Sequence, residues 1–280
     1  MEARIRVYLP KVDSLSGYRH TAFRLHKGWK NVRTDVLLDR LACAALIEHC
    51  DTLKTVQVTN ILKSSSRTLR HILSSSPRLQ VMITTDDRWY YQRRFPFLKA
   101  KDFVDMHHDS GILTPWASEA SLKVLKTKIT CIPRPDVTKL LDGRQCIGFP
   151  PESHIQNVKH LQQRVYERLA RFKNLEELFL GHGTMVETRH GADYDKHRED
   201  YQYECLEMTL KSGLDQLKGL KNLQVLDVQR MEQRIGLKEV QWMTQNWPKL
   251  REIRGLYDDG NNLEAAEWLW KHFPMIKVEM

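Results

Sequence analysis

Apolar residues recur along the chain in one short pattern. Its clearest copy is GLKNLQVLDVQRM, in which Leu223 and Leu226 are followed by Val228. Further copies read HCDTLKTVQV, SSPRLQVMIT, EASLKVLKT, FKNLEELFL, WPKLREIRG and FPMIKV. Because successive side chains of a strand point to opposite faces, each copy predicts a short β-strand with one face in the core and one open face.

The spacing of these copies indicates an internal repeat. Three intervals between leading aliphatic residues are 26 or 27 residues long: Leu53 to Leu79, Leu223 to Leu250, and Leu250 to Ile276. The intervals between the middle copies are 43, 53 and 48 residues. These longer intervals predict insertions, placed at residues 86–118 and 182–204, and the longest leaves room for a degenerate copy at residues 145–149.

An amphipathic helix pattern precedes each strand. Apolar residues between 158 and 172 recur at steps of three and four, and a similar pattern covers residues 206–217. Pro77, Pro248 and Pro274 stand between helix and strand, where a helix must end. We therefore expect parallel strands stacked in one sheet in chain order, centred near Val56, Met82, Leu125, Leu178, Leu226 and Ile253.

Stacking such units buries the apolar stripe of each helix and the apolar face of each strand, which neither could bury alone. A unit of roughly 20–29 residues with Leu-x-x-Leu-x-Leu is the leucine-rich-repeat pattern. We predict an α/β fold of this kind, a solenoid that spans residues 1–280 as one domain with residues 1–27 as an N-terminal capping segment. A doubly wound α/β fold is the alternative, but its strands would be continuous aliphatic runs.

The longest copies, VYERLARFKNLEELFLGH and LDQLKGLKNLQVLDVQRM followed by IGLKEVQWMTQNWPKLREIRGL, resemble the repeat region of fungal F-box proteins with leucine-rich repeats. The resemblance runs from about Gly28 to Val278. It implies a ribonuclease-inhibitor-like horseshoe with parallel strands on the concave face. It also implies substrate recognition for an F-box-type (cullin) ubiquitin ligase. Residues 1–30 are too short for the three helices of an F-box, so a Skp-type adaptor is expected to bind only a longer product that carries one.

Composition is that of an ordinary soluble protein, with 41% hydrophobic and 28% charged residues. No apolar run approaches the roughly 20 residues that span a bilayer. The first residues have charges inside their short apolar part, so they do not form a signal peptide. The five cysteines are scattered, which favours reduced thiols and a cytoplasmic or nuclear location. No membrane partner is expected.

Positive charge is concentrated in the first half of the chain. Residues 1–140 hold 24 Lys and Arg against 13 Asp and Glu, whereas residues 141–280 hold 20 against 22. This excess of positive charge has two interpretations. It favours an acidic partner, or it belongs to a well-solvated surface. Trp89–Tyr91 lie among arginines, a pattern that can bind nucleic acid, so an RNA-associated basic repeat protein is an alternative.

Catalytic and cofactor motifs are absent from the sequence. It contains no Gly-x-Gly-x-x-Gly, Walker loop, Gly-x-Ser-x-Gly or His-Glu-x-x-His motif. His107 and His108, followed by Asp109, are the densest metal-like cluster, but a structural metal needs four convergent ligands. We therefore predict a protein that is not an enzyme and that binds no cofactor or metal.

The open face of the predicted strands is the candidate binding surface. Its candidate residues are Gln57, Val81, Ile83, Val124, Lys126, Lys128, Glu177, Phe179, Asp227 and Arg254. An apolar centre flanked by charges is typical of protein interfaces, although scattered exposed hydrophobic residues are also normal. We predict a protein–protein interaction module; a free-standing repeat scaffold or inhibitor with no ligase is the alternative.

Overall fold

The structure is a computed structural model. It describes the following residues: 28–34, 40–58, 65–84, 97–105, 111–132, 134, 137–139, 145–147, 151–181, 205–229, 231, 233–256 and 263–279. Several predicted features lie outside them, namely the capping segment 1–27, the insertion 182–204, Trp89–Tyr91, and His107 with His108.

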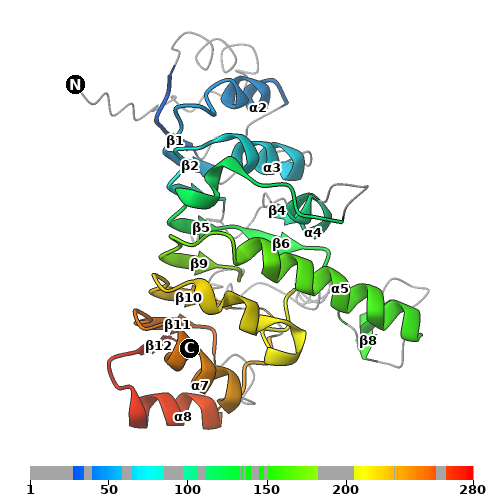
Figure 1. Cartoon of the computed structure of the whole chain (residues 1–280), viewed down its shortest axis with the longest axis vertical. Helices are drawn as coiled ribbons and strands as arrows, with labels where there is room; N and C mark the ends of the chain where they lie inside the picture. The colour runs from blue at the N-terminus through cyan, green and yellow to red at the C-terminus, as the bar shows by residue number, and fades with distance from the viewer. Residues whose placement is uncertain are drawn as a thin grey trace, which may run out of the picture.

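The main sheet contains eight parallel strands in chain order, stacked along the length of the molecule (Figure 1). All six predicted strand centres lie in it, so that prediction is confirmed. Two further strands, one at each end, complete it. The strands are β1 (Asn31–Thr34), β2 (Thr55–Val58), β3 (Val81–Ile83), β5 (Val124–Lys126), β9 (Glu177–Phe179), β10 (Val225–Asp227), β11 (Glu252–Arg254) and β12 (Lys277–Glu279).

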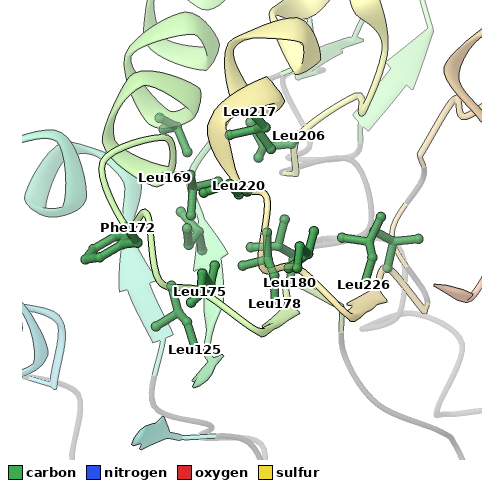
Figure 2. Packing of buried hydrophobic residues seen from close by; sticks show 14 of the residues in the cluster. Leu125, Leu169, Phe172, Leu175, Leu178, Leu180, Leu206, Leu217, Leu220 and Leu226 are labelled. Carbon is green, nitrogen blue, oxygen red and sulfur yellow. The ribbon is translucent and has the colours of Figure 1, made fainter. Parts of the chain in front are cut away.

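The strands are aligned so that one residue of each forms a continuous core row. The core row consists of Val32, Val56, Met82, Leu125, Leu178, Leu226, Ile253 and Val278. All of these side chains are buried except Val278, which is partly buried. Figure 2 shows how Leu125 and Leu178 gather with Leu169 and Leu220 in the core. Full burial of such a side chain contributes roughly 1.5–3 kcal/mol.

The helices lie to one side of the main sheet (Figure 1). They are α2 (Arg40–Ile47), α3 (Ser65–Ser75), α5 (Glu152–Leu169), α7 (Leu237–Asn246) and α8 (Leu263–His272), with the short 3-10 helices η1 (Ala117–Ala120), η2 (Leu210–Ser212) and η3 (Leu214–Gly219). Because they cover the sheet from one side only, the opposite side of the strands is available to side chains that face solvent.

Residues 206–217 do not form the α-helix that their leucine spacing predicts. The chain turns at Gly213, whose φ of 115° is left-handed, so the segment is divided between η2 and η3. The amide of Ser212 donates to Oγ1 of Thr209 at 3.1 Å and closes the first turn. Leu214 and Leu217 are nevertheless buried, so the apolar pattern was interpreted correctly as core although the helix type was wrong.

A second, smaller layer follows β3 along the chain. The short strands β4 (Phe97–Lys99) and β6 (Lys128–Thr130) pair in parallel, and α4 (Ala100–Val104) follows β4 directly.

The strands β7 (Val137–Lys139) and β8 (Gln145–Ile147) pair antiparallel. The degenerate copy that we placed at residues 145–149 is therefore wrong, because β8 belongs to a local antiparallel pair and not to the main sheet.

Arg168 joins α5 to this second layer. Its guanidinium is buried; Nε donates to the carbonyl oxygen of Phe103 at 3.2 Å and Nη1 to Oε1 of Glu119 at 2.7 Å. Its Cζ lies 4.3 Å from the ring centroid of Trp116. Desolvation lowers the pKa of Arg168 to about 10, although the charge of Glu119 opposes this shift. A buried charge is stable only when it is paired, so these contacts fix the position of α4 against α5.

Candidate binding face

Two rows of side chains flank the core row and point away from it, because side chains alternate along each strand. Together they form the open face. The first row is Asn31, Thr55, Val81, Val124, Glu177, Val225, Glu252 and Lys277; the second is Arg33, Gln57, Ile83, Lys126, Phe179, Asp227, Arg254 and Glu279. Every one of these residues is partly or fully exposed except Val225 and Asp227.

The centre of the N-terminal half of this face is apolar. Val81, Ile83 and Val124 lie side by side on β3 and β5, each partly exposed, and we call them the apolar patch. Lys126 on β5 lies opposite Ile83, and Glu177 on β9 lies opposite Val124. On the other side, Arg33 on β1 lies beyond Gln57. Arg33 is exposed, and its Nε donates to Oε1 of Gln57 at 2.7 Å. This half of the face therefore combines an apolar patch with positive charge.

Phe179 lies beside Lys126, on the side away from the apolar patch. Nζ of Lys126 lies 3.8 Å from the centroid of its ring, and Cζ of Arg254 lies 5.2 Å from it. Both distances permit cation–π attraction, so two cations stabilise the position of the ring. Nζ of Lys126 also lies 3.4 Å from a carboxylate oxygen of Glu177.

The C-terminal half carries a network of ion pairs around Arg254. Nε of Arg254 lies 2.8 Å from Oε1 of Glu252 and 3.1 Å from Oε2 of Glu279. Nζ of Lys277 lies 3.6 Å from the same oxygen of Glu252 and also contacts Glu279. The hydrogen bond from Arg254 holds the pKa of Glu252 below its ordinary value, and the hydrogen bond to Glu279 raises the pKa of Lys277. Within this network two cations meet two carboxylates, so these four charges offset one another.

Asp227 does not face solvent, contrary to the sequence-based prediction. Only 3% of its surface is exposed, and its Oδ1 accepts a hydrogen bond from the amide of Gln229 at 3.0 Å. The neighbouring strands crowd this position. A Cβ on Gly181 would lie 2.3 Å from the carbonyl oxygen of Gln229, and one on Gly255 would lie 2.4 Å from its Cα. The backbones therefore approach closely enough to enclose Asp227.

Lys128 was also predicted on the open face, and that prediction is wrong. Its predicted row ends at Lys126, because Thr127 is buried and its hydroxyl is 2.7 Å from that of Thr84. The chain leaves the main sheet there, and Lys128 lies on β6 of the second layer. The remaining predicted residues lie together on the open face. Arg33, Lys277 and Glu279 were missed as candidates, although Lys277 lies within FPMIKV and extending its alternation by one residue identifies Glu279.

The described part of the chain contains no group of three or more His, Cys, Asp or Glu residues placed to hold a metal ion. No described helix has the length and apolar character needed to cross a membrane. No protein-family model matches this chain, and comparison with curated proteins gives no match. The interpretation of the open face therefore rests on its own geometry and chemistry.

Proposed function

We propose that the chain is a leucine-rich-repeat solenoid of horseshoe form that binds another protein on its open face. The observation that carries this proposal is the apolar patch, which lies within two aligned rows of exposed side chains on eight parallel strands. An apolar centre with a polar and charged rim is the usual anatomy of a protein interface. Stacked repeats present surfaces of this kind.

The charges around the patch favour a particular partner. Arg33 and Lys126 are the charged residues of the face on β1 to β5, whereas the carboxylates lie on β9 to β12. A partner segment that places an aliphatic or aromatic side chain on the patch and a carboxylate over Arg33 or Lys126 would be complementary to it. Buried apolar anchors supply most of the affinity in such interfaces, and the charged rim supplies orientation.

Selection from a display library of random peptides tests this surface. We expect enriched peptides with an apolar residue next to Asp or Glu. Their binding to Ile83→Asp should fall by at least about tenfold, because the substitution places a carboxylate in the anchor position. Ile112→Asp is the matched control, since Ile112 is 60% exposed and lies outside the face. Circular dichroism and thermal melting should show that both variants are folded.

The protein-binding proposal is wrong if selection gives no enriched peptides, or if the peptides bind Ile83→Asp as well as the unaltered chain. Lys126→Glu sharpens the test, because it reverses the charge beside the patch without changing the patch. It should weaken the binding of acidic peptides and leave apolar peptides without a carboxylate nearly unaffected.

We further propose that this recognition serves an F-box-type (cullin) ubiquitin ligase, a role supported by the sequence resemblance. Once a protein partner is known, its ubiquitination in cells should require the chain and should decrease with Ile83→Asp. The free-standing scaffold or inhibitor makes the opposite prediction: the partner binds through the patch, and its ubiquitination does not change.

A further inference from the structure

The strand β12 forms one edge of the main sheet, and half of its backbone groups point outward. The amide of Lys277 donates to the carbonyl oxygen of Arg251 at 2.8 Å, and the carbonyl oxygen of Glu279 accepts from the amide of Gly255 at 3.0 Å. These bonds are directed toward β11. Successive residues of a strand direct their backbone groups to opposite sides, so the N–H and C=O of Val278 point away from β11. Among the described strands, none lies on that side.

Exposed apolar side chains gather beside this edge. Of the five large hydrophobic residues that are exposed in the described part of the chain, four lie on α8 or in the turn between α8 and β12. They are Leu263 (42% exposed), Trp270 (47%), Phe273 (38%) and Met275 (91%). Figure 1 shows α8 at the end of the molecule farthest from β1. Such a concentration of apolar surface marks an interaction site more often than scattered exposed residues do.

We propose that this end binds a second copy of the same chain in a symmetric dimer. A twofold axis normal to the sheet would place two β12 strands side by side and antiparallel. With Val278 opposite Val278 of the partner subunit, the two residues exchange both backbone hydrogen bonds, as a hydrogen-bonded antiparallel pair requires. The strand register therefore suits the orientation of the free backbone groups.

Charge supports a second copy over an unrelated partner. A twofold interface must be complementary to itself. In this register Lys277 lies opposite the partner's Glu279, and Glu279 lies opposite the partner's Lys277. The two copies of α8 also run antiparallel. Glu264 and Glu267 in the first half of the helix therefore approach the basic end of the partner's helix, which carries Lys271 and His272. The two sheets would join into one, with both open faces on the same side and unobstructed.

The self-association of purified residues 1–280 tests the proposal by sedimentation velocity over a range of concentrations. We expect a reversible dimer. Lys277→Glu and Glu279→Lys each place like charges opposite one another, and each should raise the dimer Kd by about tenfold. An equal mixture of the two variants should restore tight association, because each cross-strand pair of the mixed dimer then joins one glutamate to one lysine.

Val278→Pro provides a test that leaves the charges unchanged. Of the backbone hydrogen-bonding groups it removes only the N–H that points away from β11, and proline tolerates an edge position of a strand. It should abolish the dimer, while thermal melting reports whether the monomer remains folded.

Replacing both Trp270 and Met275 by serine should also weaken the dimer, whereas Ile112→Ser, a loss of exposed apolar surface elsewhere, should not.

The proposal is overturned if the unaltered chain stays monomeric throughout, or if a dimer forms whose Kd is unchanged in Val278→Pro and in both charge variants. In the second case the dimer uses another surface. Peptide binding to the apolar patch is measured separately, so failure of this proposal and failure of the protein-binding function give different results.

Discussion

The two halves of the open face share one backbone geometry and differ in how their side chains are held. On β1 to β5, the apolar patch lies next to Lys126, with Arg33 two strands away from it, and its side chains are partly exposed. On β9 to β12, Arg254 and Lys277 join Glu252 and Glu279 in a network whose four charges offset one another. Regular parallel strands therefore do not determine what a face can bind. The N-terminal half differs in presenting an apolar patch that can anchor a partner.

Fully buried leucines lie beneath both halves of the open face, and truncating them gives the largest predicted loss of stability. Leu125 on β5 and Leu226 on β10 are both fully buried. Truncation of either residue to alanine should lower the free energy of unfolding by roughly 2–5 kcal/mol, because a buried leucine is replaced by a cavity. Urea titrations measure both values. A loss from only one of the two variants would show that the halves differ in their cores as well as on their surface.

The second prediction concerns positions in the same row of opposite halves. Asp227→Ala should lower the free energy of unfolding by roughly 1–3 kcal/mol, because the amide of Gln229 loses its acceptor in a buried position. Gln57→Ala, at a partly exposed position, should change it by no more than about 0.5 kcal/mol. Urea titration of the two variants compares them directly. Equal losses would mean that the burial of Asp227 does not distinguish the C-terminal half.

The smallest predicted effect is a dependence on pH that only the C-terminal half should show. The pKa of Glu252 is held below its ordinary value, first by the hydrogen bond from Arg254. Its contribution to stability is therefore complete above the ordinary pKa of a glutamate, and it is lost as the pH falls through the lower pKa of the folded state. Urea titrations at about pH 7 and about pH 3 should show a smaller decrease in Glu252→Gln than in the unaltered chain.

Most of the main sheet could be predicted because the core row repeats at a nearly fixed interval. The leucines at 53, 79, 223 and 250 identify strands without any knowledge of contacts. The strand β1 was missed, since Val32 is its only aliphatic residue and Trp29 stands where the repeat has its leading leucine. The 3-10 segments were predicted as an α-helix because leucine spacing does not report the left-handed backbone of Gly213.

The open face was predicted less accurately than the core. Alternation assigns each residue to a side of the sheet, and it placed Val81, Ile83 and Phe179 correctly. It does not report how closely neighbouring backbones approach, so Asp227 was expected in solvent. It also cannot show where the chain leaves the sheet, which is why Lys128 was included. Both errors depend on contacts between residues that are distant in the sequence.

Pairing in chain order also determines how the sheet opens. Each strand of the main sheet pairs only with the strands before and after it, so opening at one end need not disturb the other. In the described sheet, β1 and β12 each have one paired neighbour, and local unfolding should begin there. Hydrogen exchange would then be fastest at the two ends and slowest in the middle strands. The apolar patch lies on β3 and β5, in the part of the sheet that remains ordered longest.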